Sequence, residues 1–226
     1  MKSSTNSGYK YLADDEKERF FKVVDLEEKR HRLRNKAMIY LAKYCALRVS
    51  EVTNMRLDQI NLIRREVYCI RGKKGNDNTL KIIDNDVYNT LSNYMNYRKL
   101  MGIQSEFVFT SQKSNSISRK TIDKIMKEYG LLAELPEDKC HFHVLRHTRA
   151  IELAETGFDT KEIQFWLGHK NISNTEIYFR FTSKQQEALY AKFDNEVLTE
   201  KTVNTSYIYE VVKTILREER ASEILT

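Results

Sequence analysis

Proline and glycine are scarce in this chain, with one proline and seven glycines in 226 residues. Folds built from many short strands need frequent tight turns, which these two residue types supply. Their scarcity therefore argues against an all-β sandwich or barrel and favours a helix-rich protein. A chain of this length can form one main domain with appendages.

Cysteine is also rare, and the sequence has no long apolar run. Cys45, Cys69 and Cys140 form an odd and widely spaced set, which predicts buried thiols in a reducing compartment and no disulfide framework. No stretch approaches the ~20 apolar residues that span a bilayer, and residues 1–7 lack the apolar core of a secretory signal. We expect a cytoplasmic protein, or a nuclear one if the host has a nucleus, with no membrane partner.

Acidic residues are outnumbered by basic ones, 32 to 38, which gives a formal net charge of +6. A basic protein can bind a polyanion by releasing its condensed counterions. A basic surface that serves only solubility is equally compatible with this charge, so the decision rests on motifs.

Most of the chain has helical spacing of apolar residues. Ser50 has the residue type and position to cap a short helix toward Met55, and Ser118 can cap a helix that Gly130 ends. β-favouring runs at 67–71 and 79–83 flank a basic turn and predict a hairpin. The predicted fold class is mainly α with a small antiparallel β-sheet (α+β). The remaining helices are expected at about 14–24, 32–45, 86–101, 144–156, 160–167, 173–179, 184–193 and 206–221, with a short extended piece at 106–109.

Four motifs in a fixed order suit a phosphodiester. They are 46–51 (Ala-Leu-Arg-Val-Ser-Glu), 143–147 (His-Val-Leu-Arg-His), 167–169 (Leu-Gly-His) and Tyr178, nine positions after the last histidine. Phosphoryl chemistry needs donors around the non-bridging oxygens, an in-line nucleophile and a proton source for the leaving oxygen. The guanidinium fork binds phosphate oxygens bidentately, so we expect Arg48 and Arg146 to converge in a compact helical domain.

A zinc site is an alternative use of the histidines. His143 and His147 would share a helix face, with Cys140 and His141 nearby. The pattern lacks the glutamate of zinc proteases, and Arg146 beside a metal would be unfavourable. A hydrogen-bonding and proton-carrying role beside a phosphate suits these histidines better. Trp166 is predicted to lie in the core.

Taken together, these motifs resemble the catalytic domain of the tyrosine recombinase, or phage-type integrase, family over roughly residues 12–182. The resemblance implies that family's catalytic-domain fold and a site-specific DNA recombinase that integrates, excises or inverts DNA. Tyr178 would attack the scissile phosphate, giving a 3′-phosphotyrosyl link and a free 5′-hydroxyl. Bond energy is conserved in that link, so the resemblance implies no ATP, metal or other cofactor.

The same resemblance assigns roles to the other site residues. Arg48 and Arg146 would clamp the phosphate, His143 would bind it and accept the nucleophile's proton, and His169 would bind it too. A lysine of the hairpin would be the general acid; Lys74 is preferred because it precedes Gly75-Asn76, and Lys73 stays open. Glu51 would orient the site, and His147 would support it from behind.

Two departures from the family pattern affect what we expect. Ala46 stands where glycine is frequent, which we expect to be tolerated. Only about ten residues precede the first catalytic-domain helix, whereas relatives carry an N-terminal DNA-clamping domain. The chain would then be a fragment, or resemble the short recombinases that invert fimbrial promoter segments. Either way, loss of half the clamp predicts weak, salt-dependent affinity for DNA.

The resemblance also implies double-stranded DNA as partner and a homo-tetramer on two duplexes. Residues 1–11 would be a flexible lead-in, and residues 183–226 a helical tail that docks on a neighbouring subunit through an apolar face. Arg119, Lys120 and Lys124 can face the duplex, although a solvated helix face explains them more simply. A DNA-binding regulator without catalysis and a type IB topoisomerase are the competing functions. The first should lack a catalytic residue, and none is missing; the second would show a clamp domain.

Overall fold

The computed structural model describes residues 11–72, 75–112 and 115–179. The two hairpin lysines, Lys73 and Lys74, lie outside the described residues, as do the tail 183–226 with both of its predicted helices and nearly all of the lead-in.

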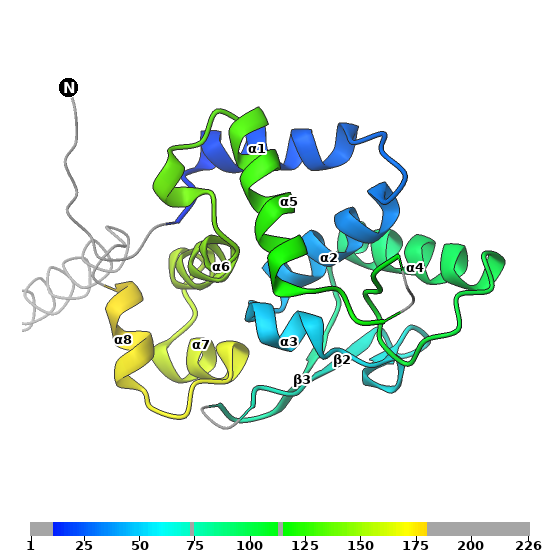
Figure 1. Cartoon of the computed structure of the whole chain (residues 1–226). Helices are drawn as coiled ribbons and strands as arrows, with labels where there is room; N and C mark the ends of the chain where they lie inside the picture. The colour runs from blue at the N-terminus through cyan, green and yellow to red at the C-terminus, as the bar shows by residue number, and fades with distance from the viewer. Residues whose placement is uncertain (1–10, 73–74, 113–114, 180–226) are drawn as a thin grey trace, which may run out of the picture. The chain divides into compact units, whose positions relative to one another are not determined.

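The described part is mainly helical with one small sheet, which confirms the predicted fold class (Figure 1). No helix in these ranges is long and apolar enough to cross a membrane. The helices are α1 (Asp14–Leu26), α2 (Arg32–Tyr44), α3 (Val49–Thr53), α4 (Asn85–Leu100), α5 (Arg119–Leu132), α6 (His143–Glu155), α7 (Thr160–Leu167) and α8 (Ser173–Phe179), with 3-10 turns at Leu57–Gln59 and Glu137–Lys139.

The sheet contains the predicted hairpin and one strand more. β2 (Glu66–Cys69) and β3 (Asn78–Lys81) pair antiparallel, with Val67 opposite Leu80, and both of these side chains point into the core. β1 (Ile60–Asn61) pairs antiparallel with the outer edge of β2. A strand of two residues is too short to show an alternating pattern, so the sequence did not predict it.

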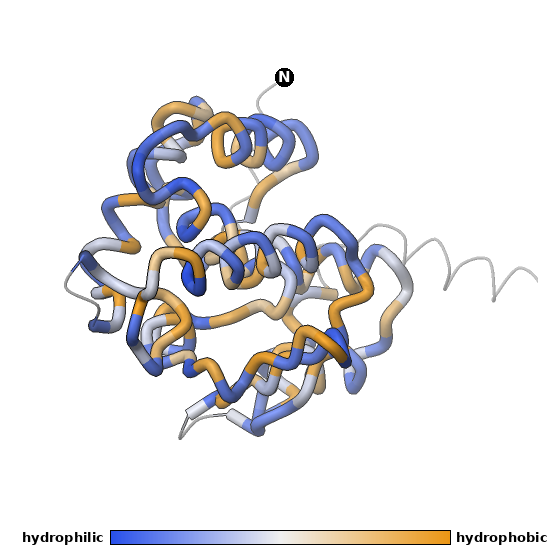
Figure 2. Tube along the Cα trace, turned by 90° about the vertical axis from the view of Figure 1, so that its right-hand side faces the viewer, coloured by the Kyte–Doolittle hydropathy of each residue, from blue (hydrophilic) through white to orange (hydrophobic). Residues whose placement is uncertain are grey.

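The core is built around α2, which packs against α1, α4 and α6. Met38, Ile39 and Leu41 of this helix are completely buried. Orange and blue alternate along the helical traces in Figure 2, as expected for helices that bury one face. A smaller apolar cluster joins α6, α7 and α8 and includes Tyr178. Trp166, predicted to be in the core, is half-buried and packs against both clusters.

The start of α3 differs from the prediction. Arg48, not Ser50, is the N-cap, and its backbone is extended at φ −78° and ψ 155°. The carboxylate of Glu51 accepts a hydrogen bond from the backbone N–H of Arg48 at 2.9 Å. A carboxylate three residues into a helix can accept from the N–H of the N-cap residue, so the side-chain hydrogen bond at this helix start comes from Glu51.

The end of α5 also differs, because the helix passes through Gly130 and continues to Leu132. A Cβ at position 130 would lie 2.5 Å from Sγ of Cys140. Glycine is therefore required by the close approach of another segment rather than by the end of a helix. The three cysteines are free and buried, as predicted.

Candidate phosphodiester site

The turn between α2 and α3 places Arg48 at the edge of the site. Its Nη1 donates to Oε1 of Glu51 at 2.6 Å, and its side chain is 26% exposed, whereas that of Glu51 is 4% exposed. The buried carboxylate thus fixes the direction of a guanidinium that still reaches solvent. Charge-assisted pairs of this kind are roughly twice as strong as neutral hydrogen bonds.

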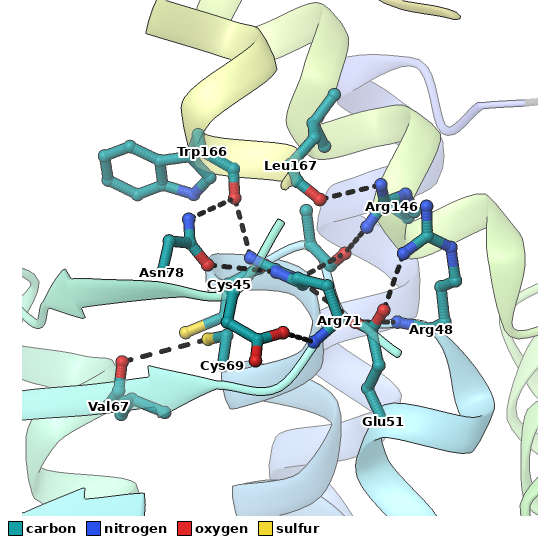
Figure 3. A network of polar contacts seen from close by, with 12 residues as sticks. Cys45, Arg48, Glu51, Val67, Cys69, Arg71, Asn78, Arg146, Trp166 and Leu167 are labelled. Atoms are coloured by element: carbon teal, nitrogen blue, oxygen red, sulfur yellow. Dashed lines mark hydrogen bonds and ion pairs between the residues drawn. The ribbon is translucent and has the colours of Figure 1, made fainter. Parts of the chain in front are cut away.

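Arg146 of α6 lies beside Arg48, at the interior end of the site (Figure 3). It is 1% exposed; Nη1 donates to the carbonyl of Ala46, and Nη2 donates to that of Leu167 at 2.9 Å. Burial first, and then the charge of Arg48, lowers the pKa of Arg146 to about 9. Arg146 remains charged at neutral pH, so two cations are held together, as predicted.

Ala46 adopts a left-handed backbone conformation, with φ of +51°. This conformation costs a residue with a Cβ about 1–2 kcal/mol. Glycine has no Cβ and would adopt it without that cost. The strained turn directs a carbonyl toward Arg146, so the geometry of the site depends on it.

A second left-handed turn presents His169. Gly168 has φ of +63° and ends α7, and His169 is only 7% exposed. Nδ1 of His169 lies 2.9 Å from the hydroxyl oxygen of Thr175, which is completely buried. The imidazole ring is therefore held through Nδ1.

The hairpin contacts this same turn. Gly75 and His169 form an isolated antiparallel bridge, and the backbone N–H of Asn76 donates to the carbonyl of Gly168 at 3.1 Å. The residues that flank the two hairpin lysines are thus anchored beside the site.

Tyr178 joins the histidines from α8. Its phenol oxygen lies 3.0 Å from Nδ1 of His147, and its ring is stacked over that of His169 with 6.5 Å between centroids. His143 meets His147 edge to face at 4.7 Å between centroids, which confirms that the two share a helix face. Tyr178 itself is 2% exposed.

The pKa values of these histidines are all lowered, so each imidazole is neutral at pH 7. Burial is the main cause for His147 and His169, whose pKa values fall to about 3. His143 lies at the open side of the site. Its pKa falls to about 4, first because neighbouring atoms partly desolvate the ring and then because of the charges of Arg146 and Arg48. Neighbouring positive charge disfavours a second positive charge.

Arg71, which follows β2 and is 3% exposed, was not predicted from the sequence to belong to the site. Figure 3 shows it between the hairpin and the two arginines, with its guanidinium on Glu51. An arginine next to a basic turn resembles one more solvent-facing cation, and no periodic pattern marked it. His147, predicted to support the site from behind, contacts the phenol directly.

The predicted site residues that the structure describes are therefore brought together. They are Arg48, Glu51, His143, Arg146, His147, His169 and Tyr178. Within the described ranges, no group of three or more His, Cys, Asp or Glu side chains is placed to hold a metal ion.

Comparisons with known proteins find relatives among the tyrosine recombinases. The tyrosine recombinase XerD of Proteus mirabilis is 31% identical over 161 residues, which are 70% of this chain and 51% of that protein. The tyrosine recombinase XerA of Pyrococcus furiosus is 33% identical over 178 residues, 77% of this chain and 58% of that protein. The chain thus spans about half the length of the curated relatives that it matches.

A solved structure shows the same fold. It is the XerH site-specific recombinase bound to a palindromic difH substrate in a post-cleavage complex, which matches with a TM-score of 0.69 and 22% identity over 86% of this chain and 56% of that one. The family model described as "Phage integrase family" matches residues 10–186, most of the chain and every candidate site residue. The chain therefore belongs to the phage integrase family.

Proposed function

We propose that this chain is a site-specific DNA recombinase that cleaves and rejoins DNA through a 3′-phosphotyrosyl intermediate. The observation that carries the proposal is the placement of Tyr178 in one site with two guanidinium groups and three neutral imidazoles. A phenol needs such surroundings because it is a weak nucleophile at its ordinary pKa of about 10.

The phosphate would enter between Arg48 and the open side of the histidine cluster. Arg48 keeps part of its side chain in solvent, and His143 is exposed, so both can reach a ligand. Arg146 is held rigidly by two carbonyls behind them. Preorganised cations of this kind stabilise the charge that develops on the non-bridging oxygens.

In the chemical step, the phenol oxygen of Tyr178 forms a bond to phosphorus and the bond from phosphorus to the 5′-oxygen breaks. The phenol gives up a proton, and the leaving 5′-oxygen receives one, for which Lys74 or Lys73 is the proposed donor. Religation is the reverse reaction, with a 5′-hydroxyl of the same or a partner strand as nucleophile. The number of phosphodiester bonds is unchanged, so the reaction consumes neither ATP nor another cofactor.

The phenol proton has two candidate acceptors. His143 is the one that the family resemblance implies, whereas His147 is the imidazole within hydrogen-bonding distance of the phenol. A pKa of about 3 makes His147 a weak base in the free protein. A bound phosphate would raise the pKa of the cluster by placing a negative charge beside it, so either histidine becomes a better base once DNA is bound.

The attack also requires a movement, because Tyr178 is 2% exposed. Phosphorus must come within about 3.5 Å of the phenol oxygen before a bond can form. We propose that DNA binding is accompanied by a displacement of α8 that presents the phenol to the phosphate.

Double-stranded DNA is the proposed partner, and a homo-tetramer on two duplexes is the proposed assembly. The similar XerH structure is bound to a palindromic difH substrate, which supports the first part. Arg119, Lys120 and Lys124 of α5 are exposed and available to a polyanion. We propose that residues 183–226 join neighbouring subunits.

The test is cleavage of nicked duplexes that trap a covalent complex, drawn from the flanks of the encoding element or from a random pool. We expect a DNA–protein adduct in the presence of chelator, and its loss in Tyr178→Phe with DNA binding retained. Tyr129→Phe is the matched control, because Tyr129 is also a buried phenol with a hydrogen bond, from Asn35, away from the site. DNA binding without an adduct in the unmodified protein would indicate a regulator and overturn the proposal.

A further inference from the structure

Arg71 satisfies every donor of its guanidinium within the protein. Its Nη2 donates to the carbonyls of Cys45 at 3.0 Å and Trp166 at 2.7 Å. Its Nε donates to Oδ1 of Asn78 at 3.0 Å. Its Nη1 donates to Oε2 of Glu51 at 3.1 Å and to the carbonyl of Ala46 at 3.5 Å. A guanidinium offers five N–H groups, so none is left for DNA.

These acceptors come from three separate segments, two of which carry a proposed phosphate-binding group and the third of which is the hairpin. The carbonyls of Cys45 and Ala46 precede Arg48, and the carbonyl of Trp166 precedes His169. Asn78 lies in β3, so the hairpin is included. Arg71 is thus the point at which the α2–α3 turn, the end of α7 and the hairpin are joined (Figure 3).

Glu51 connects Arg71 to the guanidinium that reaches solvent. One carboxylate oxygen of Glu51 bonds Arg48, and the other bonds Arg71. The side chain of Arg71 is 0% exposed and that of Glu51 is 4% exposed. A carboxylate held at both oxygens cannot rotate away, so the orientation of Arg48 depends on Arg71.

The backbone around Arg71 leaves no room for adjustment. A Cβ at Gly168 would lie 2.5 Å from Cγ of Arg71, and a Cβ at Gly75 would lie 2.5 Å from its Cβ. Both glycines belong to the bridge between the hairpin and His169. The close approach of two backbone segments to one side chain indicates that the position of Arg71 is tightly specified.

We propose that Arg71 is a positioning residue for strand cleavage, which sets Arg48 against His169 without touching the DNA. This inference rests on the proposed function. A displacement of about 1 Å far from the reacting atoms can cost about 100-fold in rate. Arg71→Lys keeps the positive charge beside Glu51 but cannot reproduce five donors in a planar fork.

The experiment compares the variant Arg71→Lys with the control Arg98→Lys in single-turnover cleavage. The substrate is a duplex that was selected with the unmodified protein. Arg98 is also a buried arginine, 4% exposed, whose guanidinium donates to the carbonyls of Val108 and Ser105 away from the site. We expect unchanged DNA affinity in both variants and a rate constant lowered about 100-fold in Arg71→Lys alone. Partial unfolding would lower the amplitude of the cleavage phase rather than its rate constant.

A substrate with a methylphosphonate at the scissile position separates positioning from a general structural defect. The methyl group replaces a charged non-bridging oxygen, so less charge remains for Arg48 to neutralise. We expect the defect of Arg71→Lys to be at least about 10-fold smaller on this substrate than on the phosphodiester. An equal defect on both substrates, or an equal loss in Arg98→Lys, would overturn the inference.

A further variant covers the case in which Arg71→Lys does not fold. Asn78→Ala removes one acceptor of Arg71, and we expect a smaller loss with the same dependence on substrate. Normal cleavage by Arg71→Lys would overturn this inference and leave the proposed function standing. If Arg71→Lys does not fold, normal cleavage by Asn78→Ala would have the same consequence. Absence of cleavage by the unmodified protein would overturn both.

Discussion

Acid should destabilise this protein through its buried histidines. The pKa values of His147 and His169 are about 3 in the folded state, against about 6.5 in an unfolded chain. Between these values the unfolded state binds more protons than the folded state. The free energy of unfolding is therefore undiminished by these histidines above about pH 6.5, and it falls progressively as the pH is lowered toward 3.

The magnitude follows from the same pKa values. Between pH 7 and pH 5, protonation of one such histidine in the unfolded chain alone lowers the free energy of unfolding by about 2 kcal/mol. His147 and His169 together give about 4 kcal/mol, a large part of the 5–15 kcal/mol that is typical of a domain. His143 is left out because its exposure allows solvent to screen it.

The assay is urea unfolding followed by circular dichroism at pH 7, 6 and 5. We expect the midpoint to fall steadily, and the double variant His147→Asn/His169→Gln to lose most of this pH dependence. His31→Gln, outside the site, should keep it. Equal stability of the unmodified protein at pH 7 and pH 5 would refute the argument, because both imidazoles would then be charged in the folded state.

Three further predictions concern packing and assembly. Gly130→Ala should lower the free energy of unfolding by about 2 kcal/mol, because its Cβ meets Sγ of Cys140, and a second change, Cys140→Ala, should recover part of the loss in the same urea titration. The three buried thiols should react with a thiol reagent only on unfolding, and rapid reaction in native buffer would contradict their burial. Deletion of residues beyond about 200 should spare cleavage and weaken multimeric assembly on DNA, as measured by light scattering; full assembly by the truncated protein would count against a linking tail.

Local signals in the sequence were sufficient for most elements and for the composition of the site. The helices around Ala37, Leu91 and Ile122 follow from the spacing of apolar residues, and the hairpin follows from two β-favouring runs around a basic turn. The order and spacing of the arginines, histidines and Tyr178 indicated which residues would meet, because phosphoryl transfer needs these groups together.

What the sequence did not predict depends on contacts between distant segments. Arg71 can be buried because distant acceptors, among them carbonyls 26 and 95 residues away, accept its hydrogen bonds. Gly130 is determined by the approach of Cys140, which no pattern within α5 reveals. The contact of His147 with Tyr178 joins residues 31 positions apart, and helical spacing gives no information on which of two neighbouring histidines will face the phenol.

The central claim is that Tyr178 is covalently linked to the DNA during the reaction. Mapping of the covalent adduct tests this claim most directly. The trapped complex would be digested with protease and nuclease, and the modified peptide identified by mass spectrometry. We expect one nucleotide-bearing peptide that contains Tyr178, joined to the 3′ side of the break and formed in the presence of chelator. An adduct on another residue, or a link to the 5′ side, would contradict it.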